Sequence, residues 1–170
     1  LFGVSPGRAT LGGIIACNLS GSRRVKVGAA RDHFLGMQAI NGRGEAFKSG
    51  GKVVKNVTGY DLCKLIAGSY GTLAVLTEIS VKVLPKAEKT RTVLVFGLHD
   101  KNAIEMLSDI MSTVHEPTAL AHLPPTIGTL SAVDLVANVG KSVTAVRVEG
   151  PSPSVISRCE KLRKYLSKFG

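Results

Sequence analysis

Three glycine-rich segments carry residue types that could bind an anion or a flat ring. The first is residues 10–21, T-L-G-G-I-I-A-C-N-L-S-G. Glycines lack a Cβ, so successive backbone N–H groups can approach a phosphate closely, and Thr10 and Asn18 add side-chain hydrogen bonds. A glycine-rich turn without a ligand has the same spacing, so the segment alone leaves both interpretations open.

Two further segments extend this pattern. Residues 55–62, K-N-V-T-G-Y-D-L, fit either a binding loop or a turn that starts a helix. Residues 68–78, G-S-Y-G-T-L-A-V-L-T-E, lead from a glycine turn into an apolar strand. Backbone amides beside a hydrophobic wall suit a flat aromatic ring, although an ordinary loop into a core strand would look the same.

Other chemistries lack their motifs. Gly51-Lys52 is followed by Val53, so no Walker A loop exists, and no G-x-G-x-x-G run opens a Rossmann unit. The three cysteines have neither disulfide-scaffold nor zinc spacing, so we predict no metal site. None of the four histidines stands in a catalytic motif, and the catalytic residues stay unknown; we expect His115 to cap the end of a helix and His33 to lie in a loop.

Composition argues against two classes of partner. The formal net charge is +10, but the basic residues are scattered and there is no Trp, with only five Phe and three Tyr. These features argue against a nucleic-acid-binding module, which is the weakest of the three functional hypotheses for this chain. No apolar run approaches the roughly 20 residues that span a bilayer.

The glycines and charges divide the chain near Pro85. Residues 1–85 contain 14 of the 19 glycines, with 11 basic and 4 acidic residues, whereas residues 86–170 contain 11 basic and 8 acidic residues. We therefore predict two units, 1–85 and 86–170, joined at Leu84-Pro85-Lys86.

The first unit should be mixed, with short helices and strands. We expect strands at 34–40 and 45–48 joined by the N-G-R-G turn, a helix at 60–66, and a strand at 72–84. In that last strand, apolar residues alternate with polar ones and define one face: Ile79, Val81 and Val83.

The second unit follows the rhythm of a split βαβ motif. Strands are expected at 92–96, 119–123 and 142–149. A helix at 101–115 should bury one stripe: Ile104, Leu107, Met111 and Val114. A second helix, capped by Ser152 with Pro153 at its first position, should bury another: Val155, Cys159, Leu162 and Leu166.

Four motifs occur in a fixed order, and together they resemble one family across residues 3–85. They are T-L-G-G-x-x-A-x-N-x-x-G, N-G-R-G, K-N-V-x-G-Y-D-L and G-S-x-G-T-L-x-V-x-T-E. The family is the FAD-binding PCMH-type flavoproteins of the vanillyl-alcohol-oxidase superfamily. Within it the motifs are most similar to the E subunits of bacterial glycolate oxidases, relatives of the D-2-hydroxy-acid dehydrogenases. The resemblance implies an α+β fold: the second half of a PCMH-type FAD-binding domain, then a partial ferredoxin-like cap.

The resemblance also implies cofactor contacts. The FAD-binding residues expected on this basis are Thr10, Gly12, Gly13, Ala16, Asn18, Gly21, Gly59, Tyr60, Asp61, Gly68, Gly71, Thr72 and Leu76. Relatives commonly carry Glu where this chain has Tyr70 and Gly where it has Ala74. The family's first FAD subdomain would lie before Leu1, so we expect the chain to be a piece of a longer protein. We expect its isolated form to bind FAD weakly or not at all and to be inactive.

The function that the resemblance implies is an FAD-dependent subunit of a glycolate oxidase-like complex. Such a subunit would relay electrons or support a catalytic subunit during oxidation of a small 2-hydroxy acid, with an iron-sulfur subunit among its partners. The expected location is the cytoplasm, with peripheral attachment to the inner membrane through those partners. A non-catalytic, flavoprotein-like scaffold is the alternative.

Overall fold

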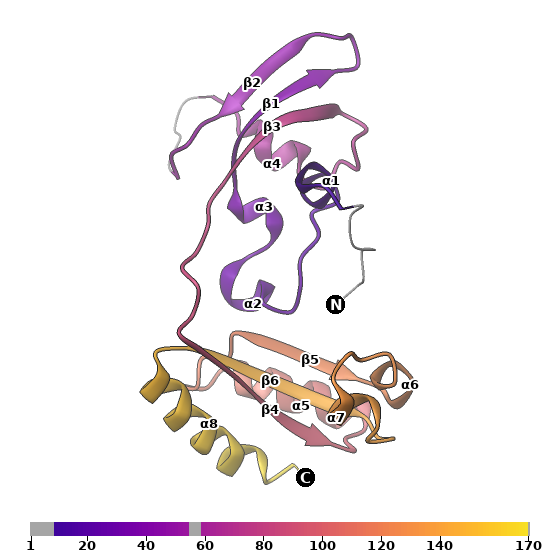
Figure 1. The fold of residues 1–170 in the computed structure, drawn as a ribbon, viewed down its shortest axis with the longest axis vertical. Helices are drawn as coiled ribbons and strands as arrows, with labels where there is room; N and C mark the ends of the chain where they lie inside the picture. Colours follow the sequence, from indigo (N-terminus) through magenta and orange to yellow (C-terminus); the bar gives the residue numbers. More distant parts are fainter. Residues whose placement is uncertain (1–8, 55–58, 170) are drawn as a thin grey trace. The chain divides into compact units, whose positions relative to one another are not determined.

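The computed structural model describes residues 9–54 and 59–169, which form two compact units that meet in sequence at Pro85 and Lys86 (Figure 1). Each unit has its own three-stranded antiparallel sheet and its own buried cluster. The α+β fold class is thereby confirmed. That the two units are an FAD-binding part and a cap stays a prediction.

In the first unit, β1 (Phe34–Asn41) lies between β2 (Ala46–Gly50) and β3 (Ala74–Val81). The Asn41 side chain fixes the β1–β2 turn, because its Oδ1 accepts hydrogen bonds from the backbone N–H groups of Arg43 (2.9 Å) and Glu45 (3.0 Å). Gly44 takes the positive φ of 78° that this turn requires. The predicted hairpin is confirmed.

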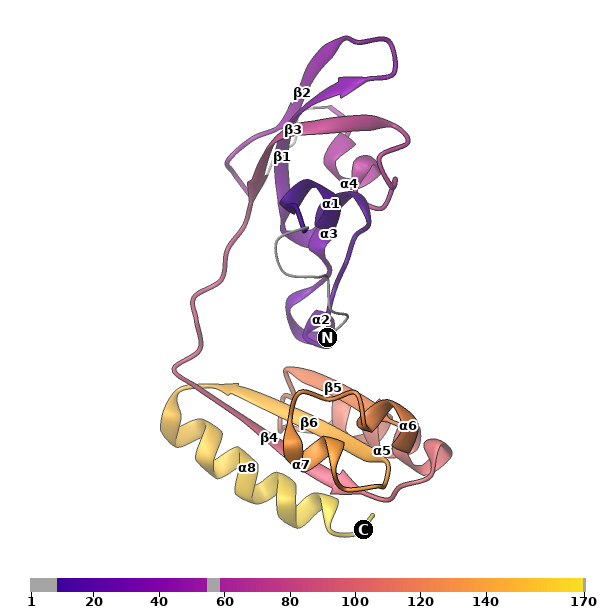
Figure 2. The ribbon, with the colours of Figure 1, turned by 45° about the vertical axis from the view of Figure 1, so that its right-hand side comes forward.

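Short helices cover the inner face of this sheet: α1 (Leu11–Ala16), α3 (Ala30–His33) and α4 (Leu62–Ile66) (Figures 1 and 2). A further turn of helix, α2, spans Arg24–Val27. The core between helices and sheet comprises Ile15, Phe34, Met37, Ala39, Cys63, Ile66 and Ala74. Ile79 and Val81 pack against this core as predicted, but Val83 lies beyond the end of β3 and is 81% exposed.

The second unit has strand order β4-β6-β5, formed by β4 (Lys89–Phe96), β5 (Ala119–Leu123) and β6 (Val143–Gly150). Its helices α5 (Asp100–Met111) and α8 (Ser152–Leu166) share one core with the strands. Two single turns, α6 (Pro125–Gly128) and α7 (Asp134–Ala137), lie between β5 and β6. This is the predicted split βαβ topology.

Two details of these helices were predicted wrongly. Helix α5 ends at Met111 and buries Ala103, Met106 and Ile110, whereas Ile104 is 60% exposed. Both apolar stripes have helical spacing, and only packing against the sheet selects one of them. Helix α8 buries the predicted residues, but Pro151 is its N-cap and Pro153 its second residue, one position away from our expectation.

His115 is also placed differently. It lies four residues beyond α5, buried with its ring edge-to-face against Tyr165, at 5.7 Å between ring centroids. It therefore packs between helices and does not cap one. In the same contact, Tyr165 Oη donates to Asp109 Oδ2 at 2.5 Å, and this hydrogen bond lowers the pKa of the Asp109 carboxyl.

The end of the β1–β2 ladder yields a stability test. A Cβ at Gly36 would lie 2.6 Å from the backbone N and O of Gly51, so Gly36→Ala should lower the free energy of unfolding by about 1–3 kcal/mol. Gly42→Ala in the same hairpin meets nothing within 4 Å and is the matched control. Urea denaturation monitored by circular dichroism measures both; equal stability of the two variants would contradict the close packing at Gly36.

Candidate functional site

The first part of the first glycine segment folds as helix α1, where the sequence had suggested an anion-binding segment or a glycine-rich turn. Thr10 is the N-cap of α1, and its Oγ1 accepts a hydrogen bond from the Gly13 N–H at 3.0 Å. Gly12 and Gly13 therefore lie in the first turn of α1, next to β3: a Cβ at Gly12 would be 3.9 Å from both Leu76 and Ile79. The threonine cap compensates for the poor helix propensity of the two glycines.

The first and third segments lie side by side (Figure 1). The Gly68 N–H donates to the Ile15 carbonyl at 3.2 Å, and the Tyr70 N–H donates to the Ala16 carbonyl at 2.8 Å. Both bonds go to carbonyl groups at the end of α1, and the Ile15 carbonyl also accepts from the Asn18 N–H at 2.9 Å. The structure thus brings together two stretches about fifty residues apart that the sequence predicted to share one site.

Asn18 has a structural task as well. Its φ is 49°, a left-handed conformation that Asn tolerates, and its Oδ1 accepts a hydrogen bond from the Arg31 N–H at 2.9 Å. Ser20 Oγ accepts from the neighbouring Ala30 N–H at 3.0 Å, so the two side chains hold the first turn of α3. The sequence analysis missed Ser20, because a contact across ten residues leaves no local signal.

The third segment forms a tight turn before β3. Gly68, Tyr70 and Gly71 have φ values of 86°, 56° and 77°. The Thr72 hydroxyl donates to the Ser69 carbonyl at 2.7 Å, and the Thr72 N–H donates to the same oxygen at 3.1 Å. Leu76 follows this turn and lies on β3. In the described sheet β3 is an outer strand that pairs with β1 alone.

The two joined segments together offer hydrogen-bond donors and bare backbone. Neither residues 10–21 nor residues 68–76 contain a charged side chain. A Cβ added at Gly21 or Gly71 would meet nothing within 4 Å, so the backbone at both positions is open. Among the described contacts the Asn18 amide nitrogen has no acceptor, and Thr10 keeps its hydroxyl proton. Uncharged donors beside bare backbone fit a phosphate or a ring carbonyl.

The second segment precedes α4, whereas the third segment follows it. Lys55, Asn56, Val57 and Thr58 fall outside the described residues, so the K-N-V-T part of the motif is not placed. Asp61 is the N-cap of α4, and its Oδ1 accepts from the Lys64 N–H at 3.1 Å. Gly59 has a φ of 77°, and Tyr60 is 93% exposed.

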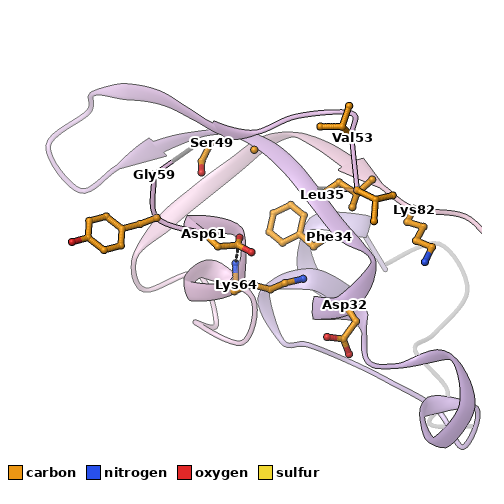
Figure 3. Close-up of a pocket in the computed structure, with 12 residues that line it drawn as sticks. Asp32, Phe34, Leu35, Ser49, Val53, Gly59, Asp61, Lys64 and Lys82 are labelled. Carbon is orange, nitrogen blue, oxygen red and sulfur yellow. Dashed lines mark hydrogen bonds between the residues drawn. The ribbon is translucent and has the colours of Figure 1, made fainter. Parts of the chain in front are cut away.

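A pocket opens beside Gly59 and Asp61 (Figure 3). Phe34, Leu35 and Val53 form its apolar wall, and two carboxylates and two ammonium groups line it, from Asp32, Asp61, Lys64 and Lys82. Its described lining includes no residue of the other two glycine segments. The structure therefore joins the first and third predicted segments but leaves Gly59, Tyr60 and Asp61 around a different hollow.

Most polar groups of this pocket already have structural partners. Asp32 Oδ2 accepts from the Ala29 N–H at 2.7 Å, and Lys64 Nζ donates to the Arg31 carbonyl. Next to it, the buried Cys63 thiol contacts the Ser49 carbonyl at 3.8 Å. Burial raises the pKa of Cys63, and the nearby Asp61 carboxylate adds to this effect, so the sulfur stays protonated near neutral pH.

Among the described residues, no group of three or more His, Cys, Asp and Glu side chains is placed to hold a metal ion. His33 ends α3, not a loop as predicted, and its Nδ1 lies 3.1 Å from the Lys82 carbonyl. His122 lies on β5 as predicted, with Nδ1 2.8 Å from Thr144 Oγ1 and Nε2 3.1 Å from Asp100 Oδ1. His99 precedes α5 as its N-cap.

Known proteins share both the sequence and the fold. The chain is 34% identical to glycolate oxidase subunit GlcD of Bacillus subtilis over 94% of its own length and 35% of that subunit. It is 56% identical to glycolate oxidase subunit GlcE of Escherichia coli over 46% of the chain and 22% of GlcE. A structure of alkyldihydroxyacetonephosphate synthase superimposes with a TM-score of 0.70 at 22% identity, covering 95% of the chain and 32% of that protein. No family model matches.

The fold is an α+β part of a larger protein, and it is shared with the structure of alkyldihydroxyacetonephosphate synthase. The sequence similarities are more specific: the chain is similar to FAD-linked oxidoreductases, which supports a fragment of a PCMH-type FAD-binding flavoprotein. It spans about a third or less of the length of these relatives. Within the described part of the chain, no helix is both long and apolar enough to cross a bilayer.

The thiols provide a test of the environment around α4. Cys17 is partly exposed at the end of α1, whereas Cys63 and Cys159 are buried. In the native protein, Ellman's reagent should therefore modify Cys17 first, and Cys63 only after denaturation, because its raised pKa and its burial both suppress the reactive thiolate. Rapid modification of Cys63 in the native Cys17→Ser, Cys159→Ser double variant would contradict the placement of Cys63.

Proposed function

We propose that residues 9–85 form part of the FAD site of a protein that oxidises small 2-hydroxy acids. The observation that carries this proposal is the pair of backbone hydrogen bonds from Gly68 and Tyr70 to Ile15 and Ala16. They join the two glycine segments into one surface of uncharged donors and bare backbone. The relatives named as glycolate oxidase subunits and D-lactate dehydrogenases support the substrate class.

FAD, when bound, would supply the two-electron acceptor for the substrate. This chain's own residues would hold it. Thr10, Gly12, Gly13, Ala16, Asn18 and Gly21 would contribute from the first segment, and Gly68, Gly71, Thr72 and Leu76 from the third. Gly59, Tyr60 and Asp61 would contribute from the start of α4. The hydroxyl of Thr10 and the amide of Asn18 would donate hydrogen bonds to the cofactor without a lysine or an arginine.

Assembly is the second part of the proposal. GlcD and GlcE are named as subunits of glycolate oxidase, and this supports a multi-subunit complex for the present chain. We place it in a cytoplasmic complex with an iron-sulfur partner, attached to the inner membrane only through other subunits. Its task there would be to relay electrons or to support a catalytic subunit.

A scaffold without turnover is the second candidate, and the arrangement of the histidines favours it. Oxidation of a 2-hydroxy acid needs a base for the hydroxyl or α proton and a cation for the carboxylate, both held in fixed geometry. His33, His115 and His122 each contact other groups of the fold. A subunit of this kind would depend on a partner for the chemical step.

Gly12→Ala separates cofactor binding from folding. Its Cβ would make only ordinary contacts at 3.9 Å, and Ala favours a helix over Gly by up to about 1 kcal/mol, so thermal stability should be unchanged or raised. FAD affinity should fall about tenfold, because the methyl group holds the ligand away from the backbone. Isothermal titration with FAD on the full protein measures this, with Gly42→Ala as the control.

Gly71 is a poorer probe for this purpose. Its φ of 77° means that any side chain strains the turn itself. A loss of flavin in Gly71→Val would therefore report on folding as well as on binding. Unchanged FAD affinity in Gly12→Ala would count against a cofactor at α1.

Dye reduction tests the division of labour. The full protein that contains this chain, purified without partners and supplied with FAD, should not reduce a dye with glycolate or D-lactate, whereas the reconstituted complex should. Robust turnover by the isolated protein that disappears on changing one of His33, His99, His115 or His122 would identify this subunit as the catalyst and refute the supporting role.

A further inference from the structure

Tyr70 has an unusual backbone conformation for its residue type. Three described non-glycine residues have positive φ: Asn18, Tyr70 and Glu116. Asn enters the left-handed region readily because its short side chain bonds locally, but a bulky aromatic residue gains no such compensation. The φ of 56° at Tyr70 is therefore a strained choice where Gly or Asn would be comfortable.

The surroundings hold this conformation in place. The Tyr70 N–H donates to the Ala16 carbonyl at 2.8 Å, which ties the residue to the end of α1. Gly68 and Gly71 on either side also have positive φ, and Thr72 closes the turn on the Ser69 carbonyl through its hydroxyl and its N–H. The backbone at Tyr70 is thus fixed from both sides.

No packing of the Tyr70 ring within the described fold offsets this backbone strain. The Tyr70 side chain is 75% exposed, unlike Tyr165, which packs against the core of the second unit. A strained backbone that presents an exposed aromatic ring indicates a contact with something outside the folded chain.

The position of Tyr70 indicates the kind of ligand. It lies between Gly68 and Gly71 in the third segment and is hydrogen-bonded to Ala16 of the first, so it stands within the surface of uncharged donors described above. A ring beside bare backbone suits a flat heteroaromatic partner, because stacking needs only a π-face and no charge.

We propose that Tyr70 stacks on a flat ring of the bound cofactor, either the isoalloxazine or the adenine of FAD, and tightens its binding. This inference rests on the proposed FAD site. The backbone of the turn would hold the polar part of the ligand, and the Tyr70 ring would cover its flat face. Tyr70 would therefore be a binding residue, not one that transfers a proton.

Two substitutions separate the ring from the backbone. Tyr70→Asn removes the ring but suits the left-handed conformation, so the melting temperature should not fall, while FAD affinity should fall about tenfold. Tyr70→Phe keeps the ring and should bind within about twofold of the unchanged protein. Val83→Asn alters another exposed apolar residue outside the site and is the matched control.

The measurement is a titration of the full protein with FAD, followed by flavin fluorescence and calorimetry. A Tyr70 ring stacked on the isoalloxazine would quench its fluorescence, and the ring-free variants would lose this quenching. Separate titrations with FMN and ADP distinguish the ring: weaker FMN binding by Tyr70→Asn assigns isoalloxazine, and weaker ADP binding assigns adenine. Tyr70→Gly, which also accepts positive φ, serves as the second ring-free variant if the first is unstable.

The outcomes are distinct. If the unchanged protein does not bind FAD, the proposed function fails. If it binds FAD and both ring-free variants bind equally well, or if Tyr70→Phe loses as much affinity as Tyr70→Asn, the stacking role of Tyr70 is refuted while the FAD site stands.

Discussion

The first unit depends on how one short helix ends. Helix α1 has six residues, two of them glycines, and cannot be stable by propensity alone. It persists because Thr10 caps its start and because Gly68 and Tyr70 donate backbone hydrogen bonds to carbonyls at its end. The same two bonds bring the third glycine segment against the first. The same hydrogen bonds therefore stabilise α1 and hold the first and third glycine segments together. A change that frays α1 would also separate the two segments that form the proposed cofactor surface.

Glycine serves two different purposes around this junction. At Gly36 it permits the backbones of β1 and the β2 end to approach closely, where a Cβ would meet Gly51 at 2.6 Å. At Gly68 and Gly71 it supplies positive φ that the turn requires. At Gly12 neither reason applies within the chain, since a Cβ would make only ordinary contacts. The proposed cofactor would supply a reason for glycine at this position.

The second unit is stabilised by a separate core, in which α5 and α8 pack against β4 and β6. Its titratable groups mostly connect elements: Tyr165 links α8 to Asp109 of α5, and His122 links β5 to Thr144 of β6 and to Asp100 at the start of α5. These contacts explain stability without providing a base and a carboxylate clamp. The chemistry that can be argued from this chain is therefore cofactor binding, and it lies in the first unit.

Local sequence rules predicted much of the framework. The turn at Asn41–Gly44, the β-branched runs of β3 and β6, and the apolar stripe of α8 were predicted correctly. Turns and periodic burial depend on near neighbours in the sequence. Helix α1 was missed because its cap and end bonds offset the glycines. In α5 two stripes were equally apolar, and only the sheet decided between them. Other features depend on contacts between residues that are distant in sequence. These are the hydrogen bonds of Gly68 and Tyr70 to Ile15 and Ala16, the contacts of Asn18 and Ser20 with α3, and the strained backbone of Tyr70. Their partners are set by chain folding, so no local pattern could show them.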